Sequence, residues 1–137
     1  MQLKYNKMSK ELEFVPYEEA LALKELGFNK WVFAYYTNDK QYPFIMDVRD
    51  LKEKYKEETQ APLYQQAFRW FREKYNIDFI IPPTGGSDFK TIGYYYEIIV
   101  EIPTEPNIES ETFKTYEEAE LECLRELIKT VKQKNNE

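Results

Sequence analysis

Histidine is absent from this 137-residue sequence, and the absence narrows the chemistry that the protein can perform. Histidine is the usual general base near neutral pH, the usual partner of a catalytic serine or cysteine, and a frequent zinc or iron ligand. No spacing in the sequence fixes two carboxylates across a cleft, as glycoside hydrolysis requires. We therefore predict that the protein is not an enzyme and has no catalytic residues.

Cysteine occurs only once, as Cys123, so the chain can form no internal disulfide and no thiolate cluster. Cys123 falls on the apolar arc of the last predicted helix, which favours an inert core thiol over a nucleophile. Magnesium can be held by carboxylates alone. The acidic side chains here are better explained as solvated charges and helix-start acids. We predict no metal and no cofactor.

Long apolar runs are also missing. No stretch approaches the ~20 residues that a membrane-spanning helix needs, and residues 94–100, the longest candidate, include Glu97. The first seven residues lack the apolar core of a signal peptide. We expect a cytoplasmic protein that does not associate with membranes.

The net charge of −6 is concentrated in one segment. Residues 101–126 contain nine acidic and two basic residues, a net charge of −7, whereas the rest of the chain carries +1. This acidic segment is either a solubilising face or a docking surface for a basic partner.

The order of the predicted elements is helix, strand, strand, helix, strand, strand, helix. Pro16 suits the start of the first helix, Gly27 and Phe28 suit a Schellman ending, and Thr115 with Glu118 forms a capping box before the last helix. The expected strands cover residues 31–37, 42–46, 78–81 and 91–102. We predict an α+β fold: a mainly antiparallel four-stranded sheet with about three helices packed largely on one face. Residues 1–13 would form an arm, 14–132 a single domain, and 133–137 a disordered tail.

The middle helix carries five aromatic rings within residues 64–75. Four of these rings fall on one stripe and are expected in the core. Trp70 lies roughly 100° from that stripe, beside Leu63, and Arg69 and Arg72 lie on other faces. Trp70 and Leu63 are either covered, by residues 47–60 or by a second subunit, or form the exposed anchor of a partner site.

Two further candidates lie elsewhere. Alternation along residues 91–102 places Tyr95 with Glu97 and Ile99 on the face away from the helices, where Phe33 or Tyr35 could complete an aromatic platform. Such platforms bind single-stranded nucleic acid or another protein, and the glutamates argue against nucleic acid. Glu120 lies mid-arc on the last helix. It is either exposed, or half-buried and bonded to a tyrosine hydroxyl or to Arg69 or Arg72.

Three segments carry a resemblance to a known family: EFVPYEEALALKELGF at 13–28, APLYQQAFRWFREKY at 61–75 and TYEEAELECLRELI at 115–128. Across residues 13–132 the chain resembles a family of small hypothetical proteins carried by phages and prophages of Bacteroidetes-type bacteria. The resemblance implies a phage context, in the host cytoplasm or the virion. It brings no established activity, and no catalytic residue is carried over.

These features predict a small phage-encoded accessory or host-modulating protein that acts by protein–protein binding. Its partner would be a host protein, a phage protein or a second copy of itself. The alternative is a nucleic-acid-binding module that uses the aromatic sheet face with Lys52, Lys54 and Lys56, or with Arg69 and Arg72. The candidate interface residues are Trp70, Leu63, Tyr95, Arg69, Arg72 and Glu120.

Overall fold

The computed structural model describes residues 13–38, 40–45, 58–88, 90–100 and 105–136. The chain divides into two compact units, residues 1–67 and residues 68–137. The division falls within helix α3 (Tyr64–Tyr75), whose first turn belongs to unit 1 and whose remainder belongs to unit 2. The single domain expected over residues 14–132 thus contains two units, which are described separately below.

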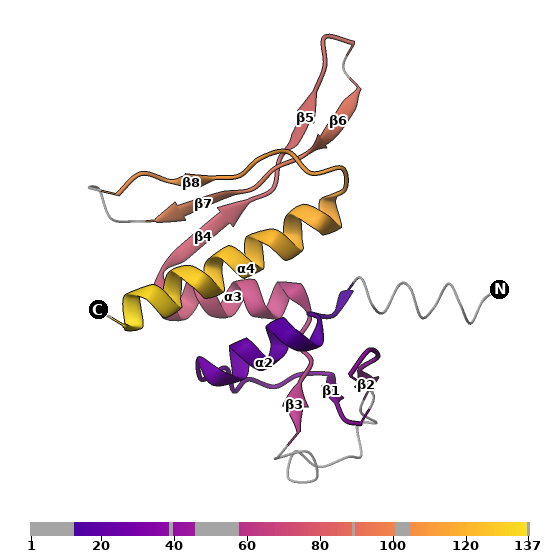
Figure 1. The fold of residues 1–137 in the computed structure, drawn as a ribbon, viewed down its shortest axis with the longest axis vertical. Coiled ribbons are helices and arrows are strands. Elements are labelled where there is room, and N and C mark those ends of the chain that lie inside the picture. Colours follow the sequence, from indigo (N-terminus) through magenta and orange to yellow (C-terminus); the bar gives the residue numbers. More distant parts are fainter. Residues whose placement is uncertain (1–12, 39, 46–57, 89, 101–104, 137) are drawn as a thin grey trace, which may run out of the picture. The chain divides into compact units, whose positions relative to one another are not determined.

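Unit 1 combines helix α2 (Tyr17–Glu25) with a small antiparallel sheet (Figure 1). The sheet has the order β2-β1-β3, with β1 (Ala34–Tyr36) between β2 (Phe44–Ile45) and β3 (Thr59–Gln60). Tyr35 is opposite Phe44 on one side and opposite Gln60 on the other. Helix α2 packs against β3.

Both ends of α2 follow from its local sequence. Pro16 is the N-cap residue, and Glu18 and Glu19 in the first turn favour the positive end of the helix dipole. At the other end Gly27 adopts a φ of 99°, and the Phe28 N–H donates to the Leu23 carbonyl at 2.9 Å. This is the expected Schellman ending, and the prediction is confirmed.

The interior of unit 1 is built from small and aliphatic side chains around two tyrosines of β1. The Tyr36 hydroxyl donates to the Val15 carbonyl at 2.6 Å, and the Val15 N–H donates to the Pro62 carbonyl at 2.9 Å. These bonds satisfy the backbone of a segment that precedes α2 and is not part of a regular strand. The fully buried residues of this interior are Val15, Leu23, Val32, Ala34, Ala61, Pro62 and Ala67.

Unit 2 contains the rest of α3, five strands and helix α4 (Tyr116–Asn135). Strands β4 (Ile77–Ile80), β7 (Glu97–Val100) and β8 (Ile108–Glu109) form an antiparallel sheet in the order β4-β7-β8. Strands β5 (Pro83–Gly85) and β6 (Thr91–Tyr94) form a separate antiparallel hairpin that extends from this sheet (Figure 1). Helix α4 packs against β6 and β7.

The predicted class is confirmed, but the predicted sheet is wrong. The described residues form an α+β fold with three helices and antiparallel strands, yet the strands make three small sheets of three, three and two strands. Residues 82–87 and 103–112 lie outside the four predicted strands, yet β5 and β8 fall within them. Two-residue and three-residue strands carry too little alternation to be recognised from sequence.

The long strand expected over residues 91–102 is interrupted at Tyr95 and Tyr96, which separate β6 from β7. The Tyr95 N–H donates to the Pro82 carbonyl at 3.2 Å, and the Tyr96 N–H donates to the Ser110 hydroxyl at 2.8 Å. The chain therefore exchanges its hydrogen-bonding partners at these two residues: β6 pairs with β5, whereas β7 pairs with β4 and β8.

Helix α4 is close to the prediction. The Glu118 N–H donates to the Thr115 hydroxyl at 3.1 Å, as expected for an N-cap threonine. Most of the predicted apolar arc is buried, but two of its expected members are not: Tyr116 is exposed and Leu121 is half-buried. The buried members are Ala119, Cys123, Leu124, Leu127, Ile128 and Val131. The helix continues to Asn135, so the tail expected to be disordered from residue 133 is helical through residue 135.

Candidate functional site

Trp70 is covered in the structure and is not an exposed anchor. Its side chain is only 4% exposed. The indole ring makes edge-to-face contacts with Phe71, at a centroid distance of 5.2 Å, and with Tyr75, at 5.4 Å, and the Lys74 ammonium lies 5.0 Å from its centroid. Of the two predicted alternatives, coverage is therefore correct. Most of the segment 47–60 proposed to cover it, residues 47–57, lies outside the described residues.

The neighbours predicted with Trp70 do not form a common apolar surface. Leu63 is half-buried and makes a single β-bridge with Phe14, and its N–H donates to the Gln66 side chain at 3.0 Å. Arg69 and Arg72 are exposed and face nearby carboxylates. Arg69 bonds Glu73 at 2.8 Å, and the guanidinium of Arg72 lies 3.9 Å from the Asp78 carboxylate.

The predicted platform around Tyr95 is not assembled as one sheet face. Tyr95 is half-buried at the break between β6 and β7, and Ile99 is half-buried in the β4-β7-β8 sheet. Tyr35 is 3% exposed and lies in the sheet of unit 1. The expected face required one continuous sheet, and the described strands do not form one.

A different exposed surface is present in unit 1, and we call it the aromatic patch. It consists of Trp31 and Phe33, just before β1, and Phe44 and Ile45 of β2. Their side chains are 59%, 45%, 50% and 41% exposed, respectively. The rings of Trp31 and Phe33 meet edge to face with centroids 4.5 Å apart. Ile45 is opposite Ala34 and Phe44 is opposite Tyr35, so β2 lies beside β1 and its two residues point to opposite faces of the sheet.

Two glutamines hold the backbone on which Trp31 is displayed. The Gln66 side-chain amide donates to the Trp31 carbonyl at 3.0 Å, and the Gln60 amide donates to the Lys30 carbonyl at 2.5 Å. The carbonyls of Lys30 and Trp31 lie before β1, so they do not take part in the hydrogen bonds between strands. The two glutamine side chains bond these carbonyls instead and order the segment on which Trp31 and Phe33 are exposed.

Sequence reasoning did not single out this patch, although Phe33 was named as a candidate for the aromatic platform. Residues 31–37 were expected to form one strand, and Phe33 or Tyr35 was expected to contribute to the platform. The strand begins only at Ala34, and Tyr35 is buried whereas Trp31 and Phe33 are exposed. The difference depends on contacts of Gln60 and Gln66, which lie about thirty residues further along the chain.

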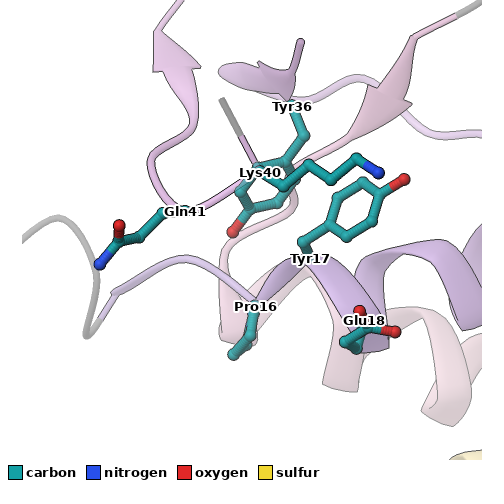
Figure 2. A pocket seen from close by; sticks show the side chains of 6 residues that line it. All are labelled: Pro16, Tyr17, Glu18, Tyr36, Lys40 and Gln41. Carbon is teal, nitrogen blue, oxygen red and sulfur yellow. The ribbon is translucent and has the colours of Figure 1, made fainter. Parts of the chain in front are cut away.

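A hollow of about 400 Å³ opens beside the start of α2 (Figure 2). Tyr17 and Tyr36 meet edge to face at 5.5 Å, and the Lys40 ammonium lies 5.1 Å from the centre of the Tyr17 ring. The described residues that line it include no thiol. Its lining residues are Pro16, Tyr17, Glu18, Tyr36, Lys40 and Gln41.

Glu120 is half-buried, as one of the two predicted alternatives stated. The described residues show no hydrogen bond from Glu120 to a tyrosine hydroxyl or to an arginine, so that part of the alternative is not found. Burial, and secondarily the charge of Glu117, raises the pKa of Glu120 to about 7. Burial also raises the pKa of the Cys123 thiol well above its ordinary value, which makes it a poor nucleophile.

Two searches of the described residues limit the remaining kinds of site. No helix among them is both long and apolar enough to cross a membrane. No group of three or more cysteine, aspartate or glutamate side chains in these same ranges is placed to hold a metal ion.

Comparison with protein-family models, curated proteins and solved structures gives no match. Function must therefore be inferred from the residues of this chain. Among the surfaces described above, the aromatic patch departs most from an ordinary solvated surface.

Proposed function

We propose that the protein acts by binding another protein through the aromatic patch, and that it performs no catalysis. The observation that carries this proposal is the exposure of Trp31 and Phe33, which touch each other while both remain exposed to solvent, at 59% and 45%. Single exposed apolar residues are common on soluble proteins, but neighbouring large ones mark interaction surfaces. Tryptophan in particular is enriched among the residues that dominate binding energy.

The surroundings of the aromatic patch indicate the character of its partner. Lys30 directly precedes Trp31, and Lys40 lies in the turn before β2; both are exposed. A surface with an apolar centre and acidic groups at its rim would complement this arrangement. In the phage setting that the resemblance implies, such a partner would be a host or phage protein.

The test compares partner capture by three forms of the full chain. The variant Trp31→Ala/Phe33→Ala removes the centre of the patch. Ile92→Ala is the matched control, because Ile92 is also an exposed apolar residue, at 69%, but belongs to the β5–β6 hairpin. We expect the double variant to lose at least tenfold in affinity for the captured partner, and the control to bind like wild type.

Circular dichroism of each variant verifies that the fold is intact. Equal binding by wild type and the Trp31→Ala/Phe33→Ala variant would refute the patch as the binding surface. Sedimentation of the purified protein tests whether the partner is a second copy of the chain. In that case the wild type sediments as a dimer, and the Trp31→Ala/Phe33→Ala variant shifts toward the monomer.

The alternative, nucleic-acid binding, has weaker support from the same residues. Arg69 and Arg72 each lie next to a carboxylate, which competes with phosphate for the guanidinium. Lys52, Lys54 and Lys56 lie outside the described residues. Titration with single-stranded oligonucleotides at low ionic strength tests this alternative, since phosphate contacts weaken steeply as salt increases.

A further inference from the structure

Strand β4 forms one edge of the β4-β7-β8 sheet (Figure 1). Strand β7 pairs with one side of β4, and no other strand among the described residues pairs with its second side. An edge strand presents N–H and C=O groups that have no partner strand, so it is a template to which another strand can add. The protection of the β4 edge therefore bears on how the protein associates.

The hydrogen bonds of the sheet identify which backbone groups point away from β7. Two residues beyond the last pair of the β4–β7 register, the Tyr95 N–H donates to the Pro82 carbonyl at 3.2 Å. Successive residues of a strand direct their backbone groups to alternate sides, so the even-numbered residues of β4 bond β7. The odd-numbered residues, Ile77 and Phe79, therefore direct their N–H and C=O groups to the open side.

The side chain of Asp78 occupies this open side. Its carboxylate accepts a hydrogen bond of 2.8 Å from the Phe79 N–H, which is one of the outward groups. The same carboxylate oxygen lies 3.9 Å from the Arg72 guanidinium, and the Asp78 side chain is 55% exposed. A strand that added to this edge would need the Phe79 N–H as a donor. It would first have to displace the Asp78 carboxylate.

The sequence around β4 makes such protection necessary. Residues 77–81 read IDFII, and Asp78 is the only one of the five that is not a strong strand former. Ile80 is 45% exposed. A run of β-branched and aromatic residues without charge on an open edge is prone to associate, and a charged residue within the run opposes this.

The strand that fits this edge best is β4 of a second copy of the chain. In an antiparallel pair related by a two-fold axis, Ile77 of each copy would be opposite Phe79 of the other, and the outward groups of both strands would be used. The Asp78 residues of the two copies would then be directly opposite each other, and like charges in that position are destabilising. Asp78 therefore opposes self-pairing twice, through its hydrogen bond and through its charge.

We propose that β4 is a strand-addition edge for a second copy of this chain, and that the Asp78 carboxylate keeps this edge closed. Removal of the carboxylate frees the Phe79 N–H and ends the repulsion, so that two β4 strands join into one continuous antiparallel sheet. The edge belongs to unit 2 and is independent of the aromatic patch, which belongs to unit 1.

Sedimentation velocity of the full chain over a series of concentrations tests this proposal. Asp78→Ala removes both the acceptor and the charge. We expect it to associate at concentrations roughly tenfold or more below those of wild type, because the incoming strand no longer displaces a charge-assisted hydrogen bond. Asp78→Asn retains the acceptor oxygen without the charge, so it should associate less than Asp78→Ala.

Asp88→Ala is the matched control. Asp88 is also exposed and also accepts a backbone N–H, that of Lys90 at 3.2 Å, but it lies in the turn of the β5–β6 hairpin. This variant should sediment like wild type. The association of Asp78→Ala should also persist when it is combined with Trp31→Ala/Phe33→Ala, which separates β4 pairing from association through the aromatic patch.

Three results would overturn the proposal: equal sedimentation of wild type and Asp78→Ala, equal association of the Ala and Asn variants, or loss of association in the combined variant. If Asp78→Ala fails to fold, the NMR signal of the wild-type Phe79 amide proton decides instead. A signal that shifts as aspartates are protonated on acidification supports the Asp78 hydrogen bond. A signal that does not shift removes the basis of the proposal.

Discussion

Gly93 shows, at the scale of one residue, how closely two segments of unit 2 approach each other. A Cβ atom at this position would lie 2.4 Å from the Phe113 carbonyl oxygen and 2.7 Å from the Thr112 methyl carbon. The first of these is a backbone atom held by hydrogen bonds to Tyr94, so it has little freedom to move. The absence of a side chain at Gly93 is what lets the segment before α4 cross β6.

Gly93→Ala is therefore expected to destabilise the protein by about 2–3 kcal/mol, because it overpacks a contact that the backbone cannot relax. Gly85→Ala is the control, since a Cβ there would meet its nearest atom, the Lys90 carbonyl oxygen, at an ordinary 3.4 Å. Urea denaturation measures both. If Gly93→Ala lowered the free energy of unfolding no more than Gly85→Ala does, the close approach of Gly93 to the Phe113 carbonyl would be contradicted.

Residue roles were predictable from sequence where they depend on adjacent positions. Gly27 and Thr115 each act through residues within one helical turn, and both predictions are confirmed. For Trp70 the sequence left two alternatives open, covered or exposed. A helical projection shows the direction in which the side chain leaves the helix, but it does not show how the rings of Phe71 and Tyr75 lie against it. The exposure of Trp31 depends on distant glutamines and has no local signal of its own.

At the scale of the element, the three helices were recognisable and the sheets were not. Apolar periodicity along α4 is a property of one segment, so most of its buried face was predicted from the sequence; Tyr116 and Leu121 are the exceptions. Residues 91–100 also alternate throughout, but their pairing is decided by distant partners: Pro83 for Tyr94 and Ile77 for Val100. Nothing within the run marks the exchange at Tyr95 and Tyr96.

The N-terminal cap of α4 provides a test at this scale. Thr115→Ala removes the hydroxyl that accepts from the Glu118 N–H, so we expect a loss of about 1 kcal/mol. Thr115→Ser retains the acceptor, and serine is at least as good an N-cap residue as threonine, so we expect no loss of stability. Thermal unfolding followed by circular dichroism compares the two, and equal melting temperatures for the Ala and Ser variants would show that the cap contributes nothing.

At the scale of the whole molecule, the two tryptophans are divided between the two units. Trp31 belongs to unit 1 and is 59% exposed, whereas Trp70 belongs to unit 2 and is 4% exposed. Each unit thus contains one tryptophan; the one in unit 1 is exposed to solvent and the one in unit 2 is buried.

We expect Trp31→Phe to leave a blue-shifted emission that acrylamide quenches weakly, because only Trp70 remains. Trp70→Phe should leave a red-shifted emission that acrylamide quenches at least twofold more strongly. Stern–Volmer plots of the two variants measure the difference. Equal quenching would mean that the burial of Trp70 or the exposure of Trp31 is not present in solution.

The tip of the β5–β6 hairpin has a practical consequence. The Gly86 N–H donates to the Lys90 carbonyl at 3.2 Å and closes the turn, while Ser87 and Asp88 inside it are exposed. Residues added between Ser87 and Asp88 would lengthen a loop whose ends are already tied together, which costs little conformational entropy. An epitope or dye-binding peptide inserted there would label the protein internally, and both the aromatic patch and α4 would keep their native sequence during partner capture.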